Sequence, residues 1–184
     1  MRRIFVAVDI SEEARRKAAD YITKLRGGEP ARGISWVHPD KLHLTLRFIG
    51  NCDEDEMRKV LSSAQFAAEN SGPITLYISG TGVFPNAKRA RVLWLGVGGE
   101  VDKMAKTTDI FNKAYGSKSE HEVFKPHVTI ARVRDATKNS KIISQHINSR
   151  FEPVGFMVSD VVVYESELHP KGSVYSAMAR YILR

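Results

Sequence analysis

Residues 43–50 read HLTLRFIG, and residues 127–134 read HVTIARVR. Both stretches begin with a histidine, an apolar residue and a threonine, and both continue in the alternating pattern that is typical of a β-strand. Because side chains alternate between the faces of a strand, His43 and Thr45 share one face, and His127 and Thr129 share one face of the second strand. If the two strands are neighbours across a cleft, two imidazoles and two hydroxyls converge there.

This set of groups suits proton transfer at phosphorus. A neutral imidazole accepts a proton and a charged one donates a proton near pH 7, so one on each side of a phosphorus atom can drive in-line displacement by water. Threonine hydroxyls can donate hydrogen bonds to the non-bridging oxygens. This chemistry needs no metal and no cofactor. A zinc site is the rival use of two histidines, but it requires a third and usually a fourth ligand. The sequence has neither a cysteine pair nor an HExxH motif.

Other enzyme classes find no support in the sequence. It has no G-x-S-x-G, P-loop or GxGxxG motif. Cys52 is the only cysteine, which rules out an internal disulfide and fits a reducing compartment. The remaining histidines stand in loop-like or helical contexts and are expected at the surface: His38, His121, His146 and His169.

Length and charge indicate how many domains to expect and which kind of partner. The chain has 184 residues and a net charge of +7, and 42% of its residues are hydrophobic. No apolar run approaches the ~20 residues needed to span a bilayer, and residues 2–9 read as a strand and not as a signal sequence. We therefore expect a single domain over residues 1–184, a cytoplasmic monomer, and a polyanionic partner such as nucleic acid.

Helical and strand patterns alternate irregularly along the chain, and several strands follow one another without a helix between them. This order favours the α+β class with largely antiparallel strands. Helices are expected over 11–27, 51–70, 100–116 and 138–150, and strands over 2–9, 42–49, 72–85, 91–98, 125–133, 155–168 and 173–183.

At these residues the chain resembles the two-histidine phosphoesterase superfamily, and within it the RNA 2′,3′-cyclic phosphodiesterases, also called LigT-like proteins or 2′-5′ RNA ligases. The resemblance implies a bilobal, pseudo-symmetric α+β fold, in which two mostly antiparallel sheets face a central cleft and the helices lie outside. The matching stretches span nearly the whole chain: RRIFVAVDI, WVHPDKLHLTLRFIG, GTGVFPNAKRARVLWLGV, FKPHVTIARVR and SELHPKGSVYSAMARYIL.

The resemblance also implies roles for the four motif residues. His43 corresponds to the proton donor that acts on the leaving O3′, and His127 to the acceptor that activates water. Thr45 and Thr129 correspond to the residues that hold the phosphate oxygens. The product in this family is a terminal 2′-phosphate, and the 2′-5′ RNA ligase activity uses a 5′-hydroxyl in place of water.

Further substrate contacts are expected around the motifs. Arg132 stands where relatives often place a phosphate-binding arginine, but three positions separate it from Thr129, so a bulge is required to bring both to one face. Single-stranded RNA is usually gripped through stacking on aromatic rings. The candidates for stacking, with core packing as the alternative, are Phe48, Phe84 and Tyr175. The basic loop NAKRAR either tracks an RNA backbone or is simply solvated; it contains Lys88, Arg89 and Arg91.

The expected activity is metal-independent hydrolysis of a terminal 2′,3′-cyclic phosphate on RNA, with tRNA fragments among the candidate substrates. Two alternatives stay open at this point. One is an RNA-end binding protein with little turnover. The other is a phosphodiesterase for a small cyclic phosphate, such as ADP-ribose 1″,2″-cyclic phosphate.

Overall fold

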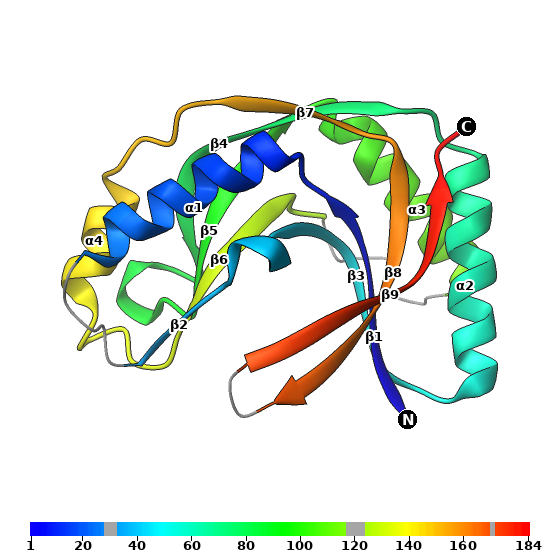
Figure 1. Cartoon of the computed structure of the whole chain (residues 1–184), viewed down its shortest axis with the longest axis horizontal. Helices are drawn as coiled ribbons and strands as arrows, with labels where there is room; N and C mark the ends of the chain where they lie inside the picture. Colours follow the sequence, from blue (N-terminus) through cyan, green and yellow to red (C-terminus); the bar gives the residue numbers. More distant parts are fainter. Residues whose placement is uncertain (28–32, 117–123, 170–171) are drawn as a thin grey trace.

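The strands of the protein form one continuous sheet. The computed structural model describes residues 1–27, 33–116, 124–169 and 172–184. Within these ranges, strands run in the order β7-β4-β5-β6-β3-β1-β8-β9, with β2 paired to β6 (Figure 1). Every strand pair is antiparallel. The strand bounds are β1 Arg2–Asp9, β2 Ile34–Trp36, β3 His43–Cys52, β4 Ile74–Phe84, β5 Val92–Gly99, β6 His127–Val133, β7 Val154–Val158, β8 Asp160–His169 and β9 Gly172–Ile182.

Four α-helices occur in the described ranges, and local signals account for where they begin and end. The Ser11 side chain accepts a hydrogen bond from the Ala14 amide at the start of α1, and Asp53 caps the Glu56 amide at the start of α2. Gly116 ends α3 in a left-handed conformation that favours glycine. The helix bounds are α1 Glu12–Arg26, α2 Glu54–Glu69, α3 Val101–Tyr115 and α4 Ser140–Ile147, and two short 3-10 helices cover Pro39–Lys41 and Ala87–Arg89.

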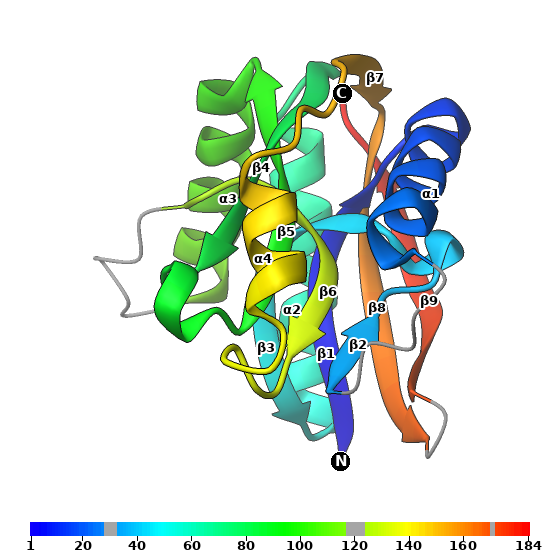
Figure 2. The same cartoon turned by 90° about the vertical axis from the view of Figure 1, so that its left-hand side faces the viewer.

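The helices gather at the two ends of the curled sheet. The helix α1 packs against α4 and β7, whereas α2 packs against α3, β8 and β9. Figure 1 shows α1 and α4 at one end of the molecule and α2 and α3 at the other, and Figure 2 looks onto the α4 end. The hydrophobic core lies between the helices and one face of the sheet, where Val6, Val8, Leu44, Val128 and Ile130 are fully buried. The opposite face of the two central strands is left for polar side chains.

The predicted α+β class, with antiparallel strands and helices outside, is confirmed. The two expected sheets are the halves β7-β4-β5-β6 and β3-β1-β8-β9 of the single sheet. They join where β3 pairs with β6, through Leu44 and Val128. This short pairing joins the two halves into one continuous sheet. None of the described helices has the length and apolar character required to cross a membrane.

The prediction of one strand over 155–168 is wrong. The chain leaves the ladder at Ser159 and divides this segment into β7, which pairs with β4, and β8, which pairs with β1 and β9. The two strands therefore belong to different halves of the sheet. Residues of β7 alternate between buried and exposed, and Val161, Val162 and Val163 of β8 are all buried. A hydrophobic pattern of this kind does not reveal which strand a residue pairs with.

Candidate active site

The two His-x-Thr motifs meet at the seam of the sheet. Leu44 of β3 pairs with Val128 of β6, and each of these residues lies between the histidine and the threonine of its own motif. Both are fully buried toward the helices, so their neighbours point to the opposite face. Since the strands are antiparallel, those neighbours face one another in crossed pairs: His43 with Thr129, and Thr45 with His127.

Backbone carbonyls fix the orientation of both imidazoles in the same way. The Nδ1 atom of His43 lies 2.7 Å from the carbonyl oxygen of Lys41. The Nδ1 atom of His127 lies 2.7 Å from the carbonyl oxygen of Lys125. A carbonyl can only accept, so Nδ1 carries the hydrogen in each ring. The Nε2 atoms are thereby the ones left to exchange protons.

Aromatic rings support both imidazoles. The ring of Phe5 stacks on His43 with 4.9 Å between centroids, and Tyr175 meets the same imidazole edge-on at 5.5 Å. On the other motif, Phe84 meets His127 edge-on at 5.0 Å. The expected stacking residues Phe84 and Tyr175 thus contact the histidine rings themselves, one on each side of the seam. Their expected contact with substrate stays a prediction.

The surroundings of His43 act on its protonation in opposite directions. Burial lowers the pKa of His43, and the nearby charges of Arg132 and His127 lower it further. The hydrogen bond to the Lys41 carbonyl and the negative charge of Asp9 raise the pKa. A proton donor has to be charged before it acts, so the two groups that raise the pKa work in favour of the role expected for His43.

Arg132 reaches the motif face because β6 contains the required bulge. In the pairing with β5, Leu93 faces Ala131 but the next residue faces Thr129, which leaves Ile130 as an extra residue. Both Ile130 and Ala131 are fully buried, and Arg132 is exposed. The bulge therefore restores Arg132 to the face of Thr129. From this face the positive charge of Arg132 lowers the pKa of His43.

A hollow of about 790 Å³ opens beside His127 and Thr45. Phe48, 58% exposed, lies on its wall, so the core-packing alternative for this residue is wrong. Asn112 of α3 also lines the hollow, and its Oδ1 atom is buried without a hydrogen-bond partner among the described residues. The wall combines the phenylalanine rings with polar and charged side chains, and such a mixture is suited to a flat ring that carries N–H groups. Sequence reasoning missed Asn112, and no local signal marks it, because helix α3 is distant from both motifs along the chain.

Two other hollows contain residues that the sequence analysis singled out. One of about 900 Å³ is lined by Lys41, Arg132 and Tyr175 among other residues. A smaller one is positively charged and contains the basic loop, with Lys88, Arg89, Arg91 and Arg134 in its wall. The three cations of the NAKRAR loop are thus gathered at one hollow. Their contact with an RNA backbone stays a prediction.

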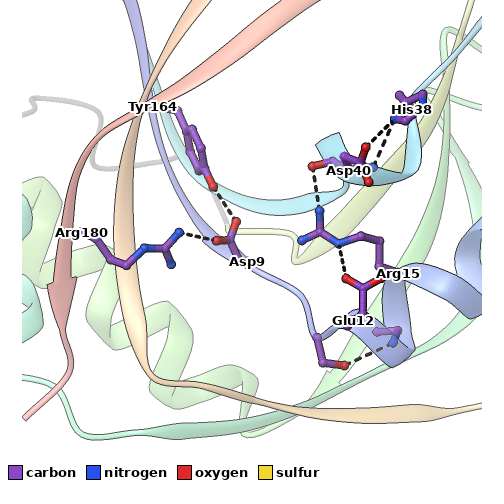
Figure 3. A network of polar contacts seen from close by, with 9 residues as sticks. Asp9, Glu12, Arg15, His38, Asp40, Tyr164 and Arg180 are labelled. Atoms are coloured by element: carbon purple, nitrogen blue, oxygen red, sulfur yellow. Dashed lines mark hydrogen bonds and ion pairs between the residues drawn. The ribbon is translucent and has the colours of Figure 1, made fainter.

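Sequence reasoning also missed the polar network behind His43. Asp9 is the register partner of His43 between β1 and β3. Figure 3 shows its carboxylate between Tyr164 and Arg180, which lie more than 150 positions along the chain. Figure 3 also shows Arg15 donating to the carbonyl of Asp40, just before β3. Nothing local in the sequence marks Asp9. A lysine two positions before the histidine is repeated at both motifs, as Lys-x-His-x-Thr, and this repeat could have indicated that the lysine carbonyls contact the imidazoles.

The surface prediction holds for two histidines and fails for a third. The side chains of His38 and His169 are 64% and 50% exposed, and His121 lies outside the described residues. His146 is fully buried. Its Nδ1 accepts from the Tyr21 hydroxyl at 2.8 Å, and its Nε2 lies 3.0 Å from the Gly82 carbonyl oxygen. Burial lowers the pKa of His146, so it is a neutral internal link between α1, α4 and β4.

The described residues contain no group of three or more histidine, cysteine, aspartate and glutamate side chains placed to hold a metal ion. The two motif histidines are accompanied instead by two hydroxyls and an arginine. Neither threonine hydroxyl has a side-chain hydrogen bond to another described residue. The site thus offers two fixed imidazoles, two free hydroxyls and one cation on a single face, which suits binding and proton transfer at an anionic phosphorus centre.

Comparison with known proteins agrees with this arrangement. The family model of LigT-like phosphoesterases matches residues 8–94 and 96–175. The RNA 2′,3′-cyclic phosphodiesterase of Archaeoglobus fulgidus is 32% identical over 94% of this chain and 96% of its own, and that of Methanothermobacter thermautotrophicus is 30% identical over 96% of each. The crystal structure of TT0787 of Thermus thermophilus superposes with a TM-score of 0.73, at 30% identity, over 99% of this chain and 98% of its own. The chain therefore belongs to the family of LigT-like phosphoesterases.

Proposed function

We propose that this protein hydrolyses terminal 2′,3′-cyclic phosphates on RNA and leaves a 2′-phosphate, with residues 1–184 acting as one bilobal domain. The observation that carries the proposal is the Leu44–Val128 pair, which brings both His-x-Thr motifs to one face of the sheet. The names of the relatives support the substrate class, because they are RNA 2′,3′-cyclic phosphodiesterases that match nearly the whole chain.

In the proposed mechanism, protons move only through Nε2 of the two histidines. Neutral His127 takes a proton from water as the water oxygen attacks phosphorus. The P–O3′ bond breaks, and charged His43 gives its proton to O3′, so the products are a 2′-phosphate monoester and a free 3′-hydroxyl. Thr45 and Thr129 donate to the non-bridging oxygens, and Arg132 balances their charge. The same ring opening, with a 5′-hydroxyl in place of water, would form a 2′-5′ linkage.

The terminal base is proposed to occupy the hollow beside His127. Phe48 and Phe84 line this hollow and offer ring faces for stacking. Asn112 borders the same hollow and its Oδ1 has no partner among the described residues, so we propose that its side chain turns toward a bound base and accepts a hydrogen bond from the base edge. Tyr175 lies on the other side of the seam, in the hollow that also contains Arg132. We propose that it borders the preceding nucleotide, and that the basic loop follows the RNA backbone beyond it.

An RNA oligonucleotide that ends in a 2′,3′-cyclic phosphate tests this function. The oligonucleotide is incubated with the protein in EDTA, beside the variants His43→Ala and His127→Ala, and the product end is identified. We expect a 2′-phosphate from the wild type and a rate lower by about 10²–10⁴-fold in each variant, as is typical for loss of a general acid or base. Wild-type rates in both variants would rule out the mechanism.

The remaining outcomes separate the alternatives. Binding of the oligonucleotide without any product would favour an RNA-end binding protein. Much faster turnover of a small cyclic phosphate than of the oligonucleotide would favour a metabolite substrate. We also propose that the protein acts as a monomer in the cytoplasm on RNA ends such as those of tRNA fragments. Light scattering of the purified protein and sequencing of the RNA ends that accumulate without it test these two points.

A further inference from the structure

Asp9 lies directly beside His43. It is the last residue of β1, and its register partner in the antiparallel pair is His43, the first residue of β3. Direct partners in such a pair have Cα atoms about 4.5–5.5 Å apart and side chains on the same face. Phe5, four positions earlier on β1, stacks on His43, which places the odd-numbered side chains of β1 on the motif face. The carboxylate of Asp9 therefore faces the site and not the core.

Two residues from the last strands hold this carboxylate in place. The hydroxyl of Tyr164 donates to Oδ1 of Asp9 at 2.7 Å, and Nη2 of Arg180 donates to Oδ2 at 2.8 Å. Arg180 is itself fixed, because its Nη1 donates to Asp160 at 2.8 Å. The side chain of Asp9 is only 27% exposed. Burial, together with the carboxylate, raises the pKa of Tyr164 to about 12, so Tyr164 remains a donor at neutral pH.

The other groups that face His43 do not supply a negative charge. From β6 come the cation Arg132 and the second imidazole, His127, and both disfavour a proton on His43. From β9 comes the ring of Tyr175. Lys41 contributes its carbonyl, and its ammonium group donates to the Ser173 carbonyl. Among the described residues, Asp9 is the one carboxylate whose charge acts on His43.

We propose that Asp9 is a positioning residue whose carboxylate, held by Tyr164 and Arg180, favours the charged form of the His43 imidazole for proton donation. The interaction is electrostatic, since no hydrogen bond joins the two side chains, and it counters part of the effect of burial and of the nearby arginine. The importance of Asp9 for catalysis rests on the donor role proposed for His43. The effect of Asp9 on the charge of His43 is independent of that role and can be measured in the absence of any substrate.

The test is a titration of the His43 ring by NMR, with its signal assigned by its absence in His43→Asn. In Asp9→Asn the amide oxygen can accept from Arg180 and the amide NH2 can donate to the Tyr164 hydroxyl, but the charge is lost. We expect the pKa of His43 to fall by about one pH unit, as for the loss of a nearby opposite charge. The matched control is Asp160→Asn, which removes a carboxylate from the same network on the far side of Arg180. It should change the pKa of His43 much less.

Kinetics and a conservative variant complete the test. The alkaline limb of the kcat/KM profile should move to lower pH in Asp9→Asn by the same amount, with roughly tenfold lower activity above that limb. Asp9→Glu should restore most of the charge on His43. Asp9→Ser replaces Asp9→Asn if the amide variant does not fold. An unchanged pKa of His43 in the charge-removing variant would overturn the inference. Failure of cyclic phosphate hydrolysis, with the pKa lowered as expected, would instead reject the proposed function alone.

Discussion

Leu44 and Val128 pair across the seam between β3 and β6, and both are fully buried. Each is the central residue of a His-x-Thr motif, so one cross-strand pair aligns both motifs at once. The same pair places each histidine beside the threonine of the other motif, not beside the other histidine. A phosphate that contacts both hydroxyls is then flanked by one imidazole on each side, which is the geometry that in-line displacement requires.

This geometry predicts that the two threonine hydroxyls act in catalysis. In Thr45→Val and Thr129→Val the branched shape is kept and the hydroxyl is lost. We expect kcat for cyclic phosphate opening to fall by about one to two orders of magnitude in each, since a hydrogen bond to a charged group contributes about 1.5–3 kcal/mol. Steady-state kinetics measure the effect. Thr75→Val, on the exposed side of β4, is the control and should keep wild-type kcat. Unchanged kcat in both motif variants would contradict the assignment.

The bulge in β6 predicts that Arg132 binds the substrate phosphate. Removal of the cation in Arg132→Met should raise KM by about one to two orders of magnitude. The KM of Arg132→Lys should lie between those of the wild type and Arg132→Met, because lysine keeps the charge but cannot form the paired contact of a guanidinium. Arg58→Met removes the same charge from the surface of α2, where Arg58 pairs with Asp55, and is the control. Equal KM values for Arg132→Met and the control would show that Arg132 does not touch the phosphate.

Asn112 predicts a preference among terminal bases. Its buried Oδ1 can accept a hydrogen bond from the exocyclic amino group of adenine or cytosine. We expect oligonucleotides ending in these bases to have about tenfold higher kcat/KM than one ending in uridine, and Asn112→Leu to remove the difference. Competition assays with the different cyclic phosphate ends measure it. Asn70→Leu, on the exposed end of α2, should keep the preference. A wild type that does not discriminate would reject this contact.

His146 predicts how stability depends on pH. Burial lowers its pKa in the folded protein, whereas in the unfolded chain the ordinary value of about 6.5 applies. The unfolded state therefore binds more protons, and the free energy of unfolding falls as pH decreases below about 6.5, by at most ~1.4 kcal/mol per pH unit for this group. Urea unfolding between pH 5 and pH 8 measures the slope. The slope should be shallower in His146→Gln and unchanged in the exposed-site variant His38→Gln. Equal slopes in the wild type and both variants would contradict the role of His146 in the pH dependence.

Local patterns predicted most of the elements and the face of each motif. The alternation in 43–46 and 127–130 assigns His43 and His127 to a polar face because the intervening residues are apolar. The bulge also leaves a trace, since Ile130 and Ala131 are consecutive apolar residues within an alternating strand. Partners that lie far apart along the chain could not be predicted. Asp9 is fixed by Arg180, and His146 is buried only because α1 and β4 enclose it.

The carbonyl contacts of Lys41 and Lys125 leave each imidazole with a single nitrogen for proton exchange. Under the proposed roles, one turnover ends with His43 neutral and His127 charged, the reverse of the starting state. Neither ring can pass its proton onward through Nδ1, so the pair returns to its starting state only by exchange with solvent at the open cleft. Until that exchange occurs, the enzyme holds the protonation state that re-forms the cyclic phosphate, and neither hydrolysis nor attack by a 5′-hydroxyl can begin again. Proton exchange with solvent therefore becomes a determinant of turnover.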